Sequence, residues 1–129
     1  MKVACVTDDG RTISQHFGRA TYYAVLTVED GKIVARELRD KMGHQHYASQ
    51  DQATGEHHGL DAASHNKHVS MADVISDCEA LLCRGMGYGA YASMQQLGIK
   101  PVVTDVEDVE DAVQAYVEGR LQDHPEKLH

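Results

Sequence analysis

Histidine is the residue type whose number and spacing suggest chemistry in this chain. Six of the nine histidines fall between residues 44 and 68. Neutral imidazole binds zinc, copper, iron and nickel, and metal binding can order a flexible segment around the ion. The alternative is a polar, solvated stretch with a histidine-biased composition. As metal ligands the sequence predicts His44, His46, His57, His58, His65 and His68.

A second stretch, residues 79–91, has the pattern of an anion site. A short apolar run, Ala80 to Cys83, predicts a buried strand. Glycines at every second position follow it, and a helix is expected over Ala90 to Leu97. Backbone N–H groups at a helix start carry a partial positive charge and bind anions. The stretch lacks the dinucleotide and phosphate-loop fingerprints. The alternative is a tight turn in which glycine supplies positive φ. The predicted anion contacts are Arg84, Gly85, Gly87 and Gly89.

The cysteines are three, Cys5, Cys78 and Cys83, without a CxxC pair. This count argues against a disulfide framework and against a four-cysteine metal site. Cys5 and Cys78 fit core positions. Cys83 ends the predicted strand beside the glycines, where a helix start and Arg84 would favour a thiolate. The alternative for Cys83 is an apolar core cysteine.

Composition excludes several classes of function. The formal net charge is −8, so general electrostatic binding to nucleic acid is not expected. Tryptophan is absent and one phenylalanine is present, so a base-stacking surface is not expected either. No apolar run approaches the ~20 residues of a membrane span, and the N-terminus enters a strand-like run without a signal peptide. We therefore expect a cytoplasmic protein.

The elements that must position these residues follow from apolar periodicity and turn signals. Strands are expected at 2–7, 22–28, 32–38, 80–83 and 100–104, and helices over 70–78, 90–97 and 109–118. They predict an α/β fold with a mixed five-stranded sheet as a single domain, 1–121. A histidine-rich loop is inserted at 40–69, and residues 122–129 form a polar tail that frays. Ligands of such sheets bind beyond the carboxyl ends of the strands, so residues 7–9, 83–85 and the histidine loop are expected to gather there.

Several pieces of the chain, in this order, resemble the dinitrogenase iron–molybdenum cofactor biosynthesis (nitrogenase accessory factor) family. They are Ser14–Ala20, the hairpin with a histidine-bearing linker, Cys83–Gly87 and Ala112–Leu121. The resemblance implies a three-layer α/β/α fold with a ribonuclease H-like motif. It also implies a carrier of a metal–sulfur cofactor, not an enzyme. The cluster would be of iron–molybdenum type or, as in one branch, a molybdenum–copper sulfide. This chain departs from the family in its longer, more histidine-rich loop.

The resemblance extends the predicted site. A sulfide-rich cluster is anionic, so guanidinium and backbone N–H donors suit its rim. The cofactor-binding residues would be His16, Arg19, Cys83, Arg84, Gly85, Met86, Gly87 and Gly89. A recipient or scaffold protein is the expected partner, with no nucleic acid and no membrane, and the chain is expected to be a monomer or weak oligomer.

Two other functions stay open at this point. One is a small regulatory domain that binds a nucleotide or phosphate at the glycine-rich turn. The other is a magnesium-dependent nuclease that would use Asp8 and Asp9, although no further acidic residue is placed at the end of another inner strand.

Overall fold

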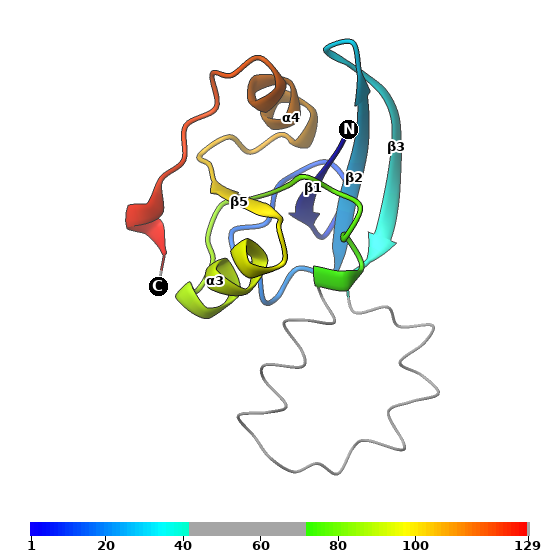
Figure 1. Cartoon of the computed structure of the whole chain (residues 1–129). Coiled ribbons are helices and arrows are strands. Elements are labelled where there is room, and N and C mark those ends of the chain that lie inside the picture. The colour runs from blue at the N-terminus through cyan, green and yellow to red at the C-terminus, as the bar shows by residue number, and fades with distance from the viewer. Residues whose placement is uncertain (42–71, 129) are drawn as a thin grey trace, which may run out of the picture.

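The computed structural model describes residues 1–41 and 72–128, which build one mixed five-stranded sheet (Figure 1). The strands lie in the order β3-β2-β1-β4-β5. β1 pairs antiparallel with β2 and parallel with β4, β2 pairs antiparallel with β3, and β4 pairs parallel with β5. The strand bounds are Lys2–Thr7, Tyr22–Glu29, Lys32–Asp40, Ala80–Cys83 and Lys100–Val103 for β1 to β5. The predicted mixed sheet is confirmed.

The hairpin of β2 and β3 forms because Asp30 and Gly31 both adopt positive φ, 53° and 78°. Positive φ at both central residues is the geometry of the two-residue turn that matches the twist of paired strands. β3 ends at Asp40, two residues beyond the expected end of the strand at residue 38, and Asp40 lies opposite Tyr22.

In the described part of the chain, two α-helices cover the sheet, α3 (Tyr88–Gln96) and α4 (Val109–Val117). Asp108 caps α4, since its Oδ2 accepts a hydrogen bond of 2.9 Å from the Asp111 N–H. Gly98 and Gly119 follow the two helices with φ of 82° and 78°, the left-handed conformation that ends many helices. The predicted helix stops are therefore confirmed, whereas α3 begins two residues earlier than expected.

Elements lie on both faces of the sheet. On β3, Arg36 forms an ion pair with Glu110 of α4, whereas Arg39 forms one with Asp77. Positions three apart on a strand point to opposite faces, so α4 and the segment 72–78 lie on opposite faces. This agrees with the predicted layers, while the likeness to ribonuclease H stays a prediction. None of the helices among the described residues has the length and apolar character needed to cross a membrane.

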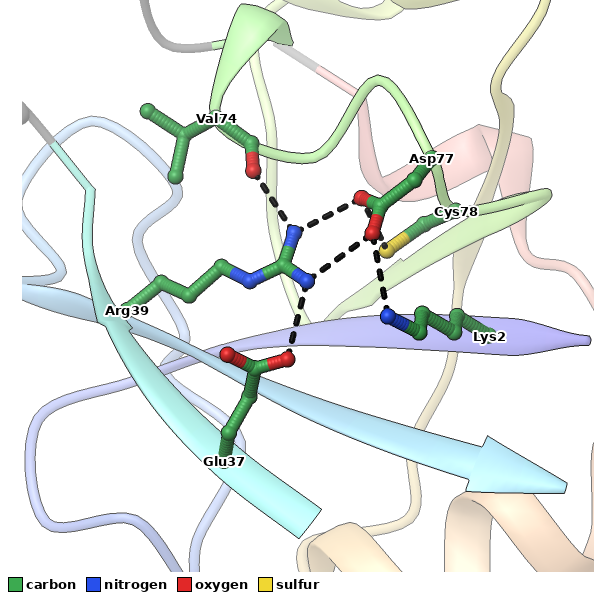
Figure 2. A network of polar contacts seen from close by, with 6 residues as sticks. All are labelled: Lys2, Glu37, Arg39, Val74, Asp77 and Cys78. Atoms are coloured by element: carbon green, nitrogen blue, oxygen red, sulfur yellow. Dashed lines mark hydrogen bonds and ion pairs between the residues drawn. The ribbon is translucent and has the colours of Figure 1, made fainter. Parts of the chain in front are cut away.

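The segment 72–78 departs from the expected helix. Ala72 and Asp73 are helical, but turns follow, and the Cys78 N–H donates to Ile75 O at 2.9 Å. In a continuing α-helix this N–H would donate to Val74 O. That carbonyl instead accepts a 2.8 Å bond from Arg39, which also binds Asp77 through two N–H groups (Figure 2). Ser70 and Met71, the first two residues of the expected helix, lie outside the described residues.

The C-terminal segment, expected to fray, is held against β5. The His124 N–H donates to Val103 O at 2.8 Å, and the Asp123 carboxylate accepts a 2.9 Å bond from the Val103 N–H. A 3₁₀ helix, η1 (Pro125–Lys127), follows, and Leu128 bridges to Met86. The expectation of a frayed tail came from polarity alone, whereas these contacts are made by backbone groups and by the Asp123 carboxylate.

Candidate site at the carboxyl edge of the sheet

The three parallel strands end at one edge of the sheet, at Thr7, Cys83 and Val103. We call this the carboxyl edge. The antiparallel register places Tyr22 opposite Thr7 and Asp40 opposite Tyr22, so β3 also ends there. The expected gathering of residues 7–9 and 83–85 is confirmed. The six histidines between 44 and 68 lie outside the described residues, and Lys41, which precedes that stretch, is at this edge.

Backbone hydrogen bonds join the loops that follow these strands. The Arg84 N–H donates to Ser14 O at 3.2 Å, and the Phe17 N–H donates to Gly85 O at 3.1 Å. His16 is thereby carried by a loop that lies directly against residues 84 and 85. The same loop reaches the loop after β5, because the Ile13 N–H donates to Glu107 O at 2.7 Å. The three loops therefore form one continuous surface.

The amino terminus of α3 opens onto this surface. Gly87 is its N-cap, so no side chain caps the helix, and its first turn carries no acidic residue. The first-turn N–H groups of Tyr88, Gly89 and Ala90 have no acceptor within the helix. These donors fit an anion. Gly87 has φ of −79° and ψ of 157°, a conformation open to any residue, so positive φ does not explain the glycine at this position.

The predicted arginines and His16 differ in burial. Arg84 is half-buried, and its backbone N–H is already used. His16, Arg19 and Arg11 are exposed on the loop after β1. The loop turns back on itself, since the N–H groups of Arg19 and Ala20 both donate to His16 O at 3.1 Å. Exposed cationic side chains on a loop of this kind remain free to turn towards a ligand.

Met86 belongs to the core. Its side chain is 1% exposed, and its backbone bridges to Leu128. Gly85 is buried as well, with its carbonyl taken by Phe17. The predicted donors ran from Gly85 to Gly89. The backbone donors that open onto the surface are instead those of the first turn of α3, which begins one residue after Gly87.

Cys83 is a buried thiol, which agrees with the alternative of an apolar core cysteine. The side chain is 0% exposed, because β4 is a central strand covered on both faces, and its Sγ lies 3.7 Å from Val102 O. Burial raises the pKa of Cys83 to about 12, outweighing the lowering by a backbone hydrogen bond from Gly85. The role of Cys83 as a cofactor ligand stays a prediction.

Thiol reactivity tests this assignment. Cys5, Cys78 and Cys83 are all free and buried, and burial also raises the pKa of Cys78 to about 12. We expect iodoacetamide at pH 8 to label the native chain far more slowly than the urea-unfolded chain, because the thiolate is the reacting species. Intact-mass spectrometry counts the adducts, and rapid labelling of Cys83 alone in the native chain would contradict a buried thiol.

The acidic residues after β1 serve the loop. Asp9 Oδ1 accepts from the N–H groups of Arg11 and Thr12, both at 2.8 Å, and these bonds lower the pKa of Asp9 to about 2. Asp8 Oδ1 accepts from the N–H and hydroxyl of Thr21. No cluster of acidic, histidine and cysteine side chains suited to a metal ion occurs within residues 1–41 and 72–128. Asp8 and Asp9 thus have hydrogen-bond partners within the chain, and the nuclease alternative stays a prediction.

A buried cation at this edge was missed by the sequence interpretation. Lys41 is 1% exposed and its ammonium nitrogen lies 4.4 Å from the centre of the Phe17 ring. The backbone N–H of Lys41 donates to Thr21 O at 3.0 Å. A lysine after a strand gives no sign of burial in the sequence, since lysine is mostly exposed. The contact joins the end of β3 to the loop that carries His16.

Comparisons with known proteins bear on this site. The sequence model of the family described as "Dinitrogenase iron-molybdenum cofactor" matches residues 1–119. An uncharacterised protein of Methanocaldococcus jannaschii is 25% identical over 122 residues, which are 95% of this chain and 90% of that protein. The FeMo cofactor biosynthesis protein NifB of Frankia alni is 28% identical over 119 residues, which are 92% of this chain and 21% of NifB.

Among solved structures, the apo form of the orange protein from Desulfovibrio gigas aligns with a TM-score of 0.65 and 21% identity, over 95% of this chain and 92% of that chain. This likeness supports the α/β fold. The family match spans nearly all of the sequence, including the loop after β1, the residues 83–87 and α4. The chain therefore belongs to the dinitrogenase iron–molybdenum cofactor family.

Proposed function

We propose that the chain binds an anionic metal–sulfur cofactor at the carboxyl edge and carries it for cofactor biosynthesis or delivery. The observation that supports this most is the uncapped start of α3 beside Arg84, on a surface shared with the loop of His16 and Arg19. Family membership points the same way, since nearly all of this chain matches part of a FeMo cofactor biosynthesis protein.

The chemistry is capture without turnover. First-turn N–H groups of α3 would donate to the sulfide-rich rim of the cofactor, and the Arg84 guanidinium would add a charged donor. His16, Arg19 and the histidines of the stretch 44–68 would contact metal or rim. The cluster is iron–molybdenum or molybdenum–copper sulfide, and its recipient is another protein.

Anaerobic reconstitution tests the proposal. The full chain is incubated with sulfide and either molybdate or iron, with or without copper, desalted, and examined by visible absorption and elemental analysis. We expect a coloured protein with bound metal. Arg84→Gln should reduce retention roughly tenfold, the size of one charge-assisted hydrogen bond. Lys100→Gln is the matched control, because it removes one positive charge at the start of β5, the opposite edge.

Replacing the six histidines at 44–68 by alanine should also weaken retention and leave the fold intact by circular dichroism. Absence of metal and colour under every condition would contradict the proposal. A thermal shift with a nucleotide panel, and none with cofactor components, would favour the regulatory alternative instead.

A further inference from the structure

β3 is an edge strand with an open outer side. It is the last strand in the sheet order, and no strand of the described part of the chain pairs with that side (Figure 1). The strand is nine residues long, and Leu38, two residues before its end, is 52% exposed. Long exposed edges readily pair with another chain, and natural proteins usually shorten or bend them.

The outward backbone groups of β3 follow from the hydrogen bonding of β2. Met1 and Val28 exchange hydrogen bonds of 2.9 and 2.7 Å, so the even-numbered residues of β2 bond towards β1. Its odd-numbered residues therefore bond towards β3, as does Thr21, whose carbonyl accepts from the Lys41 N–H. In the regular part of this hairpin, odd-numbered residues of β2 pair with odd-numbered residues of β3. The outward groups belong to the even positions Arg36, Leu38 and Asp40.

The regular part of β3 is self-complementary in charge. Residues 36–40 read Arg-Glu-Leu-Arg-Asp. When the strand runs antiparallel to its own copy with Leu38 on the two-fold axis, Arg36 faces Asp40 of the copy and Glu37 faces Arg39. Opposite charges then meet at four positions, and the exposed Leu38 side chains meet at the centre.

Neighbouring registers lack this match. Outward backbone groups occur only at even positions, so two antiparallel copies must pair even residues with even residues. The neighbouring two-fold registers that meet this condition have their axis at residue 36, 37 or 39. Each of these places a charged side chain opposite its own copy, which is unfavourable. A cavity of about 250 Å³ lies beside Leu38, lined also by Gly10, Ala24 and Leu26, and gives the apolar side chain of the copy room to pack.

We propose that two copies of this chain associate through β3, antiparallel about Leu38, to form a continuous ten-stranded sheet. The pairing supplies backbone hydrogen bonds at Leu38 and at the Arg36–Asp40 pairs. The surface is separate from the first turn of α3, so the pairing does not depend on cofactor binding.

Analytical ultracentrifugation of the full chain over a wide concentration range tests the proposal. We expect a concentration-dependent dimer that Leu38→Lys abolishes by placing two like charges on the axis. Leu97→Lys is the matched control, since Leu97 is 45% exposed at the end of α3 and should leave the dimer unchanged. Circular dichroism verifies that both variants fold.

Charge reversal tests the register. Asp40→Lys should weaken the dimer roughly tenfold, because it faces Arg36 twice in the assembly. The double variant Arg36→Asp with Asp40→Lys should restore it. A chain that stays monomeric up to about 1 mM, a dimer that survives Leu38→Lys, or a double variant without recovery would each overturn the proposal. If the chain stays monomeric and β3 instead binds a strand-forming peptide of another protein, β3 would be a docking edge for that protein.

Discussion

Replacing Phe17 by alanine is expected to lower the free energy of unfolding by about 3–5 kcal/mol, the usual range for a buried aromatic side chain. Phe17 is 3% exposed in the core cluster. The substitution also removes the ring beneath the ammonium group of Lys41, a contact worth about 0.5–2 kcal/mol. Urea unfolding followed by far-ultraviolet circular dichroism gives the change.

The same substitution is expected to reduce cofactor retention under conditions where the chain is still folded, because the buried Phe17 ring anchors the loop of His16 in the core and beside Lys41. Phe17→Leu keeps most of the apolar volume and is the control, with a loss below about 1.5 kcal/mol. A loss for Phe17→Ala no larger than for Phe17→Leu would show that the apolar volume at this position does not support this loop.

Arg39→Met is expected to lower the free energy of unfolding by about 2 kcal/mol at pH 7. Methionine keeps an apolar stem but removes the guanidinium, which binds both oxygens of Asp77 at 2.7 and 2.9 Å and the carbonyl of Val74 at 2.8 Å. Charge-assisted, bidentate hydrogen bonds are the strong ones. The expected loss of free energy is modest because the Asp77 side chain is 45% exposed and solvent screens the pair.

The pH dependence identifies the source of this loss. The hydrogen bonds from Arg39 hold the pKa of Asp77 well below its ordinary value of 3.8. Because the folded-state pKa is the lower one, the stabilisation is present above about pH 4 and is lost as the pH falls further. The difference between Arg39→Met and the unaltered chain should therefore shrink in acid. Arg120→Met removes an exposed pair with Glu118 and should leave the free energy of unfolding nearly unchanged at any pH.

Local sequence signals predicted those parts of the fold that local physics decides. The expected strands 22–28 and 32–38 form a hairpin because Asp30-Gly31 between them adopts two positive φ values easily, and the expected helix 109–118 lies between the N-cap Asp108 and Gly119. The run Ala80–Cys83 was apolar enough to be a central strand. The carboxyl edge could be predicted from these elements, because parallel strands joined by crossover connections end at the same edge of the sheet.

Features decided by distant partners were not predictable. The helix expected at 70–78 gives way to turns because Arg39, more than thirty residues earlier, takes the carbonyl of Val74. The neighbours of Cys83 in the sequence favour a thiolate, but strands on both sides of β4 bury it. Lys41 under the loop of Phe17 depends on a side-chain contact across the sheet edge, for which periodicity carries no signal.

The attachment of Arg39 to Val74 and Asp77 has a consequence for how this chain can vary in length. It ties the strand before residue 42 to the segment after residue 71, independently of what lies between them. With both ends held, lengthening the stretch costs only closure entropy, about 0.6 kcal/mol for each doubling. Insertions or deletions there should be tolerated by the folded domain, so relatives are free to exchange this stretch for one with other ligating residues while the sheet remains the same.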